Sequence, residues 1–517
     1  MLRVPSAAVV LTGLLTLVLT QVSGASPAQD ALALSSRIDE LTGLRLAQEE
    51  IPPAPLADDA EFFRRLSLDL NGRIPSLIQL VDFLDDTRSD KRRRWVDELL
   101  DGPDNAPLYV EHFAHFWRRQ FLALSTMQSE ALVVPLEGWL RKQITANAPY
   151  DRMVRGLLTD ANISAFYQAN ENKAENLASR SSRLFLGVKL ECAQCHDDRS
   201  GGKWKRAQFW EYAAFFTGLR TELGDSSLVM APRPQPTGPA RIRIGGSETW
   251  VEARFPDGGQ PDWQRAITPR QALSEWITRG DNPWFARATV NRLWHYFLGV
   301  GLIDPVDGLG TEDNPPSHPE LLDELVRQFV AHDFDLKFLI RAITGSSTYQ
   351  RSSRQTDPRQ AELRVFARAA SRALTPEQLY DSMVLATGYR SDPAKIGAYE
   401  AFQMGPPRAM FLAPFDDPNS QPVDFQASIQ QALMMMNGKF TEEATSSTRS
   451  ATVAAVIDSN RPLAQRIDEL YLVTLSRKSR PLETQRLLEY ATTHESKQAL
   501  RDIFWSLLNS TEFVLNH

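Results

Sequence analysis

The segment Cys192-Ala-Gln-Cys195-His196 contains the residues in this chain whose types and spacing are best suited to chemistry. The sequence has two cysteines in total, and they lie three positions apart with a histidine directly after the second. In c-type haem attachment, two cysteines at this spacing form thioether bonds to the porphyrin, and the adjacent histidine ligates the iron. The spacing therefore predicts one covalently bound haem c, with Cys192 and Cys195 as attachment points and His196 as the proximal ligand.

Three other interpretations of this segment are compatible with the sequence. The two thiols could form a disulfide, whose reactive version is a thioredoxin-like redox pair, although no βαβ pattern surrounds them. A non-haem metal could instead be bound by thiolate, imidazole and carboxylate ligands, with Asp197 or Asp198 supplying the carboxylate. The cysteine pair could also have a purely structural role.

No residue stands out in the sequence as the sixth ligand of the iron. His112 and His115 lie on the predicted helical stretch 111–117, and Met127 follows shortly after it. Histidine and methionine both ligate haem iron, but such residues are more often packed or solvated side chains than ligands. His115 is the first candidate for the distal position.

The residues after the motif would suit a bulky apolar cofactor, and they would equally suit a hydrophobic core with a solvated face. Cations among them could pair with haem propionates. The aromatic residues are Trp204, Phe209, Trp210, Tyr212, Phe215 and Phe216, and the cations are Lys203, Lys205 and Arg206.

The N-terminus has the pattern of an export signal. Arg3 is its only charged residue, an apolar stretch runs from Ala7 to Leu19, and small residues around Gly24 suit cleavage. The apolar stretch is shorter than the ~20 residues that a membrane span needs, so a retained anchor is the less favoured alternative. We expect an exported protein, periplasmic or extracellular, with no transmembrane segment after the signal peptide. Export agrees with haem c, because the haem is attached outside the bacterial cytoplasm.

The composition is that of a globular protein with more than one domain. The chain has 517 residues, of which 42% are hydrophobic and 23% charged. The formal net charge of -7 argues against nucleic acid as a partner, because binding to phosphates depends on clustered Lys and Arg. We expect a signal peptide at 1–24, a linker at 25–58, a helical domain with the motif at 59–220, a linker with a short β insert at 221–267, and a helical C-terminal domain at 268–517.

Local patterns predict a mainly α fold, with two helical domains joined by a Pro/Gly-rich segment that contains a small β-hairpin-like insert. Apolar residues recur at steps of three and four after Glu61, which is typical of helices. The run 317–320, Ser-His-Pro-Glu, has the spacing of a capping box. Alternating residues at 240–244 and 249–255, separated by Gly245-Gly246, predict the hairpin.

Distinctive runs surround the motif. Residues 183–197 read Arg-Leu-Phe-Leu-Gly-Val-Lys-Leu-Glu-Cys-Ala-Gln-Cys-His-Asp, residues 64–72 read Arg-Arg-Leu-Ser-Leu-Asp-Leu-Asn-Gly, and residues 149–151 read Pro-Tyr-Asp. This region resembles the planctomycete cytochrome-type domain of unknown function. The resemblance implies an exported cytochrome-like protein, and it supplies no established activity.

The second half of the chain has runs of its own. They include Asp-Asn-Pro at 281–283, Val-Asn-Arg-Leu-Trp-His at 290–295 and Asn-Pro-Pro-Ser-His-Pro-Glu-Leu-Leu at 314–322. These runs are similar to the helical domain of unknown function that commonly follows the cytochrome-type domain. One departure lies beside the motif: members of the cytochrome-type family usually have a second histidine where this chain has Asp198. If that histidine is a metal ligand in relatives, the site is altered here.

We therefore expect an exported haem-binding protein that passes single electrons to a redox partner protein. The alternative is a haem-free secreted binding or scaffolding protein, connected with polysaccharide degradation, in which the cysteine pair is structural or binds a non-haem metal. A third hypothesis is a haem or non-haem metal enzyme with an open coordination position. The sequence has no G-x-S-x-G elbow and no convincing pair of catalytic acid and base.

Overall fold

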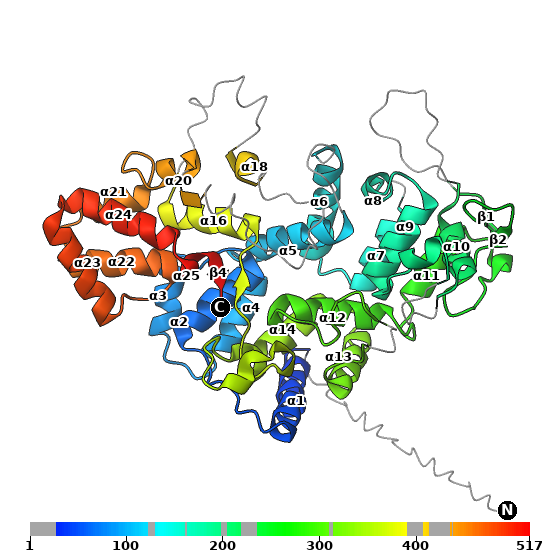
Figure 1. Cartoon of the computed structure of the whole chain (residues 1–517), viewed down its shortest axis with the longest axis horizontal. Coiled ribbons are helices and arrows are strands. Elements are labelled where there is room, and N and C mark those ends of the chain that lie inside the picture. Colours follow the sequence, from blue (N-terminus) through cyan, green and yellow to red (C-terminus); the bar gives the residue numbers. More distant parts are fainter. Residues whose placement is uncertain are drawn as a thin grey trace, which may run out of the picture.

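Helices make up most of the described structure, which confirms the mainly α fold expected from the sequence (Figure 1). Within the part of the chain that is described, no helix combines the length and the apolar character needed to cross a bilayer. The computed structural model describes residues 27–122, 130–160, 163–197, 204–218, 235–309, 314–389, 407–412, 435–436 and 438–517.

The first helix, α1 (Pro27–Gln48), occupies most of the segment that we expected to be linker. Ala31, Leu34 and Ile38 are buried at three- and four-residue steps, and the helix packs against α14 (Leu336–Gly345). Ser35 is buried in the same face, and its Oγ donates a hydrogen bond to the carbonyl of Ala342 at 2.8 Å. Residues 27–48 of the segment 25–58, which the sequence suggested as linker, thus form a packed helix, and its small buried residues let the two helices approach closely.

The segment from Asp59 to Phe216 forms a series of short helices. Side-chain caps fix where several of them begin: Asp58 accepts a hydrogen bond from the amide of Glu61 at 2.8 Å, and Ser76 and Gln79 form a capping box. The α-helices are α2 (Asp59–Asn71), α3 (Leu77–Asp85), α4 (Lys91–Asp101), α5 (Ala106–Phe121), α6 (Glu130–Thr145), α7 (Tyr150–Thr159), α8 (Ala165–Ala169), α9 (Ala174–Ser181) and α10 (Arg206–Ala213). A π-helical turn (Ser182–Leu186) and two 3-10 turns (Glu191–Gln194 and Ala214–Phe216) complete the segment.

The β insert expected between the two helical regions is present. Strand β1 (Arg241–Arg243) pairs antiparallel with β2 (Trp250–Glu252), and Ile242 lies opposite Val251. Gly246 has a φ of +73° in the connecting turn, a backbone conformation that favours glycine. The hairpin contacts α10, so it lies beside the helix that follows the motif (Figure 1).

Helical structure resumes after the hairpin, as the sequence predicted. Two residues of β3 (Arg372–Ala373) pair antiparallel with β4 (Leu515–Asn516) near the end of the chain. The helices are α11 (Pro269–Ile277), α12 (Phe285–Leu298), α13 (Pro319–Ala331), α14, α15 (Ser347–Gln350), α16 (Pro376–Thr387), α18 (Pro407–Leu412), α20 (Lys439–Ala444), α21 (Ala451–Asp458), α22 (Leu463–Leu475), α23 (Pro481–Thr493), α24 (Ser496–Leu508) and α25 (Thr511–Val514), with 3-10 turns at Trp263–Arg265, Pro358–Ala361 and Leu363–Val365.

Two large hydrophobic cores divide the chain at a different place from the expected domain boundary. The larger core takes buried residues from Ala31 to Phe366, on both sides of the β insert. The other core takes residues from Leu374 to Phe513, together with Leu68 and Ile74 from the N-terminal half. Packing therefore changes near residue 370, whereas composition suggested 221–267, because helices on either side of the insert bury their apolar faces against one another.

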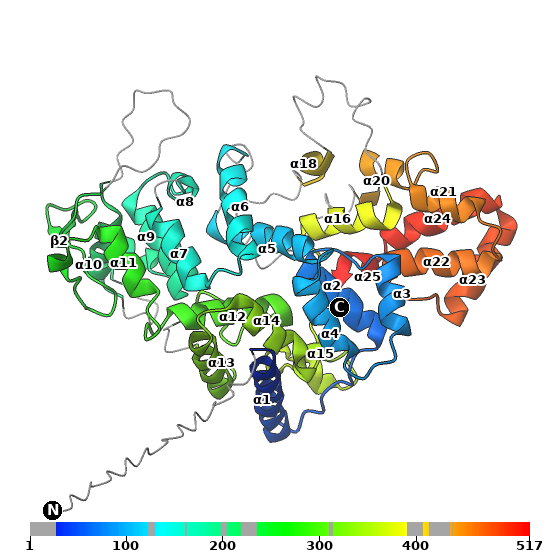
Figure 2. The same ribbon diagram turned by 180° about the vertical axis from the view of Figure 1, so that it is seen from behind.

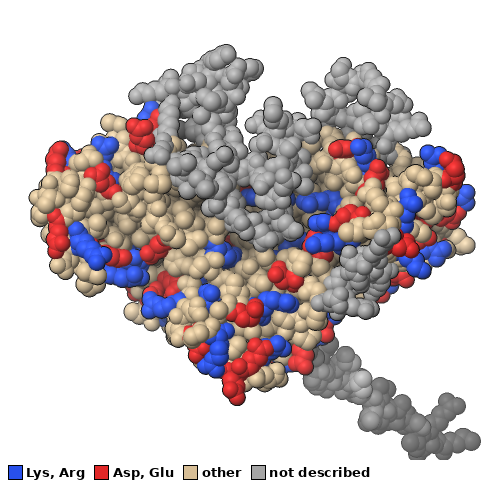
Figure 3. Space-filling model, in the orientation of Figure 1, with Lys and Arg blue, Asp and Glu red and all other residues tan. Residues whose placement is uncertain are grey.

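The C-terminal residue of the chain is held against the N-terminal part of the fold. Figures 1 and 2 both place the C-terminus against α2, and the guanidinium Nε of Arg65 donates to the carbonyl of His517 at 3.2 Å. On the face shown in Figure 3, the described Lys and Arg side chains are interspersed with Asp and Glu.

Gly72, which ends α2, is expected to be intolerant of a side chain. Its φ is +69°, and a Cβ built there would lie 2.8 Å from Cγ of His112 on α5. We expect Gly72→Ala to lower the free energy of unfolding, measured by denaturant titration, by at least about 1–3 kcal/mol, the cost of placing alanine in this backbone region. Gly43→Ala in the middle of α1, where a Cβ meets nothing within 4 Å, should raise it by about 0.5–1 kcal/mol. Equal effects in the two variants would contradict the steric argument.

Candidate functional site

The Cys-X-X-Cys-His motif lies on the surface, at the end of a short turn. Residues Glu191–Gln194 form a single 3-10 turn, and Ala193 is buried beneath it. Cys192 and Cys195 are free thiols, and both are exposed. His196 is exposed as well. The three residues that the sequence singled out therefore stay together and are accessible from solvent.

The turn is held in place by the helix that follows it. The indole Nε1 of Trp210, on α10, donates to the carbonyl of Gln194 at 3.1 Å, and the amide of Arg206 donates to Oδ1 of Asp197 at 2.9 Å. The guanidinium Nε of Arg206 also donates to Gln194 at 3.3 Å. Contacts from α10 to both sides of Cys195 fix the backbone on which the thiols are displayed.

Residues near the motif that could have served a cofactor have other partners in this structure. The predicted aromatic residues, Trp204 and Trp210 among them, are buried and belong to the larger core. Arg183 forms ion pairs with Glu191 and, at 3.0 Å, with Asp307. The hydrogen bond that Arg183 donates to the carboxylate of Glu191 raises the pKa of Arg183. Lys203 and Asp198 lie outside the described residues.

The donor set of the motif fits haem c. Two free, exposed thiols are the groups that thioether attachment requires. Nδ1 of His196 lies 2.8 Å from the carbonyl of Asp197, the arrangement in which Nδ1 carries the proton and Nε2 has its lone pair available for a metal. Oδ1 of Asp197 already accepts from the amide of Arg206, so that oxygen has a structural role.

His115 is not placed to act as the distal ligand of an iron bound at His196. It lies on α5, near the centre of the molecule, whereas the motif packs against α9 and α10 beside the hairpin (Figure 1). Nε2 of His115 lies 3.1 Å from Glu111 and 3.7 Å from Glu137. This arrangement does not favour His115 as the sixth ligand, and its position in the sequence gave no information on which helix α5 would face.

The three residues around His115 have ligand atoms within 4.8 Å of one another, a grouping that could surround a cation. However, both carboxylates are engaged by arginines. Arg141 donates to Glu111 at 2.6 Å and to Glu137 at 3.0 Å, and Arg118 lies 3.1 Å from Glu137. The charges of the carboxylates are balanced without a metal, so the cluster is best described as an ion-pair network between α5 and α6.

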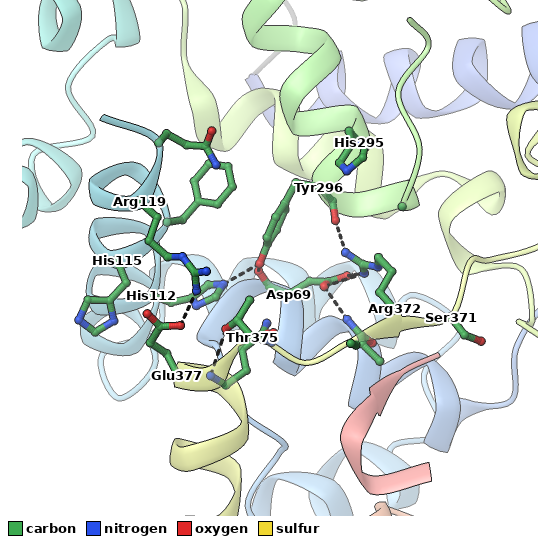
Figure 4. Close-up of a pocket in the computed structure, with 16 residues that line it drawn as sticks. Asp69, His112, His115, Arg119, His295, Tyr296, Ser371, Arg372, Thr375 and Glu377 are labelled. Carbon is green, nitrogen blue, oxygen red and sulfur yellow. Dashed lines mark hydrogen bonds and ion pairs between the residues drawn. The ribbon is translucent and has the colours of Figure 1, made fainter. Parts of the chain in front are cut away.

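A pocket of about 280 Å³ lies next to this network, where α2, α5, α12, β3, α16 and β4 meet (Figure 4). Most of its side chains are polar or charged, and they come from segments far apart in the sequence. The lining residues are Asp69, His112, His115, Phe116, Arg119, Gln120, His295, Tyr296, Gly299, Ser371, Arg372, Ala373, Thr375, Glu377, Gln378 and Asn516.

Asp69 is the centre of the hydrogen-bond network beneath the pocket. Its carboxylate accepts from Nη2 of Arg372 at 2.8 and 2.9 Å, from the hydroxyl of Tyr349 at 2.9 Å, and from Nδ2 of Asn516 at 2.7 Å. Asp69 is 1% exposed. The carboxylate thus joins α2 to β3, α15 and β4, and it neutralises a guanidinium inside the protein.

A second ion pair crosses the pocket from α5 to α16. Nη1 of Arg119 donates to Glu377 at 2.8 Å, and Nη2 of Arg118 donates to the same carboxylate at 3.3 Å. Burial acts to raise the pKa of Glu377, but the two guanidinium groups outweigh it and lower that pKa to about 2. Glu377 is therefore ionised at neutral pH, and its ion pair with Arg119 is formed.

His112 is expected to make stability depend on pH. Its Nε2 lies 2.6 Å from the hydroxyl of Tyr296, which donates to the backbone carbonyl of Asp69 at 2.8 Å. Burial lowers the pKa of His112 to about 3. The unfolded chain, with an ordinary imidazole pKa near 6.5, takes up a proton at higher pH than the folded chain. The contribution of His112 is complete above pH 6.5 and is lost as the pH falls, by about 2 kcal/mol at pH 5.

The measurement for this prediction is denaturant unfolding between pH 7 and pH 4.5. His112→Gln should have a shallower loss of stability over this range than the unchanged protein. His494→Gln, at an exposed position, serves as the control and should leave the slope unchanged. Identical slopes for His112→Gln and the unchanged chain would show that His112 does not remain neutral in the folded state.

Sequence reasoning missed the pocket. The run 64–72 was noted for its similarity to other proteins, and nothing in it predicted that Asp69 would meet Arg372. The available signal was an acidic residue within the apolar run Leu66–Leu70, where an unpaired charge would be costly. Such a residue implies a buried partner, but the sequence does not say which one.

Two family models match this chain. Residues 37–221 match PSCyt2, "Protein of unknown function (DUF1549)", and residues 269–409 match PSD1, "Protein of unknown function (DUF1553)". The expected pairing of two domains of unknown function is confirmed. The motif lies in the first matched region, and the pocket takes residues from both. Neither a curated protein nor a solved structure matches the chain.

Proposed function

We propose that this chain, in which a PSCyt2 domain precedes a PSD1 domain, is an exported protein that binds one haem c and transfers single electrons. Cys192 and Cys195 would form the thioether bonds, and His196 would be the proximal ligand. The observation that carries the proposal is the state of these groups: two free, exposed thiols on one turn, followed by a histidine whose Nδ1 meets a backbone carbonyl.

The residues around the motif would orient the iron ligand. The contact of Nδ1 with the carbonyl of Asp197 restricts rotation of the imidazole of His196 and favours the tautomer with a free Nε2. Trp210 and Arg206 hold the backbone of the turn. When bound, haem would supply an iron centre that gains or loses one electron as its oxidation state changes.

Exposure of the motif suits exchange of electrons with another protein. A reduced redox protein would donate one electron at this surface, and an oxidised redox protein would accept it. The N-terminal pattern of Arg3, the apolar stretch 7–19 and the small residues near Gly24 supports export to the periplasm or beyond, where haem c is attached. The partner protein is identified in this proposal only by its redox chemistry.

The visible spectrum of the purified protein tests the proposal. The full chain should be produced in a bacterium together with the cytochrome c maturation system. We expect a Soret band and pigment that stays with the chain on a denaturing gel. A colourless protein that contains zinc, iron without haem, or a disulfide between Cys192 and Cys195 would overturn the proposal. It would favour the haem-free alternative with a structural or metal-binding cysteine pair.

A further inference from the structure

Three of the residues that line the pocket carry a buried polar atom with no hydrogen-bond partner among the described residues. Gln120, on α5, is 3% exposed, and its Nε2 has no acceptor. Asn516 is also 3% exposed, and its Oδ1 has no donor. The Nε of Arg372 is also buried, and it has no acceptor. Because all three residues line the pocket, a molecule bound there could satisfy them.

The charges that line the pocket are already balanced. Asp69 pairs with Arg372 at 2.8 Å, and Glu377 pairs with Arg119 at 2.8 Å. An anion would have to compete with these carboxylates, and a cation would have to compete with these guanidinium groups. The open groups of Gln120, Arg372 and Asn516 are two N–H donors and one amide oxygen, which match neutral hydroxyl and carbonyl groups.

Two aromatic rings supply the apolar part of the wall. Phe116 and Tyr296 both line the pocket, and their ring centroids lie 4.8 Å apart at an interplanar angle of 63°. Apolar and aromatic walls with a few placed polar groups are typical of small-molecule sites. A volume of about 280 Å³ lies at the small end of such sites, so the occupant is of limited size.

We propose that the pocket binds a small, neutral, polyhydroxylated molecule of about the size of a monosaccharide. Nε2 of Gln120 and Nε of Arg372 would donate to oxygens of the ligand, and Oδ1 of Asn516 would accept from one of its hydroxyl groups. The rings of Phe116 and Tyr296 would pack against its C–H groups. The proposal is independent of haem, because the pocket and the cysteine motif lie on different elements.

The test measures binding of named probes to the full chain by saturation-transfer NMR and isothermal titration. The neutral probes are D-glucose, D-galactose and D-mannose, and the anionic probes are D-glucuronate and inorganic phosphate. We expect saturable binding of at least one neutral hexose, and weaker binding of both anions. Absence of saturable hexose binding, as for a pocket that contains only water, would overturn the proposal. Anions that bind as tightly as the hexoses would do the same.

Gln120→Leu separates a binding role from a structural one. It should weaken hexose binding by about tenfold, the effect of one lost hydrogen bond. It should also raise the melting temperature of the ligand-free protein, because a buried amide nitrogen without a partner is replaced by an apolar group. Gln143→Leu, on α6 and outside the pocket lining, should leave affinity unchanged. Phe116→Leu provides a second variant, and it should weaken binding because one ring is removed. Unchanged affinity in both pocket variants would contradict the assignment.

Discussion

Replacement of Asp69 by asparagine is expected to lower the free energy of unfolding by about 3–5 kcal/mol, the range for loss of one partner from a buried ion pair. Asparagine has nearly the same shape, so the effect is electrostatic. Its amide nitrogen would face donors from Arg372, Tyr349 and Asn516, all of which now point at a carboxylate. The partly buried guanidinium of Arg372 would remain without its counter-charge.

Denaturant titration of Asp69→Asn measures this loss, and two further variants show its origin. Asp69→Asn combined with Arg372→Met should be more stable than Asp69→Asn alone, because the unpaired cation is gone. Asp281→Asn removes a carboxylate from an exposed pair with Arg279 and should cause no measurable change. If Asp69→Asn and Asp281→Asn behave alike, the buried pair does not stabilise the fold as argued.

The position of Asp69 explains why a large effect is expected. Its neighbour Leu68 belongs to the smaller core, whereas Leu66 and Leu70 belong to the larger one. Helix α2 thus contributes to both cores, and the carboxylate of Asp69 connects it to β3 and β4. A change at this residue affects the contact between the two cores as well as one ion pair.

Features of the fold that depend on neighbouring residues could be predicted from the sequence. The helix that begins at Pro319 and the hairpin of β1 and β2 were both predicted from local patterns, and both are present. The predicted capping box at 317–320 is not formed, because His318 is the N-cap residue and makes no side-chain cap hydrogen bond. Helix α1 was missed because its contacts with α14 involve residues some 300 positions away, as in the hydrogen bond from Ser35 to Ala342. The division into cores near residue 370 was missed for the same reason.

The two candidate sites also differ in how far apart their residues lie in the sequence. The cysteine motif could be found because its three residues are nearly consecutive and cysteine is rare in the chain. The pocket could not be found, because its residues come from distant parts of the chain. Tyr296 lies more than 200 residues after Asp69, and Asp69, Tyr296 and Arg372 belong to three different elements, α2, α12 and β3. Each alone is typical of an ordinary helix or loop, and only folding brings them together.

Replacement of both Cys192 and Cys195 by alanine is expected to remove covalently bound pigment completely. Each single replacement leaves one thiol and should retain a reduced amount of haem joined by one thioether bond. Because both residues are exposed, these changes should not unfold the protein, so loss of pigment reports attachment itself. The mass of the intact chain and haem staining of a denaturing gel measure the attached haem directly.

His196→Ala separates attachment from ligation. The two thioether bonds do not involve the imidazole, so the variant should keep covalent pigment while its iron spectrum changes through loss of the proximal nitrogen. His494→Ala removes another exposed histidine and should leave the spectrum unchanged. Pigment that survives the double cysteine replacement would show that haem is bound elsewhere. A His196→Ala spectrum identical to that of the unchanged protein would show that the iron ligand is another residue, and the contact between His196 and Asp197 would then be a local feature of the turn.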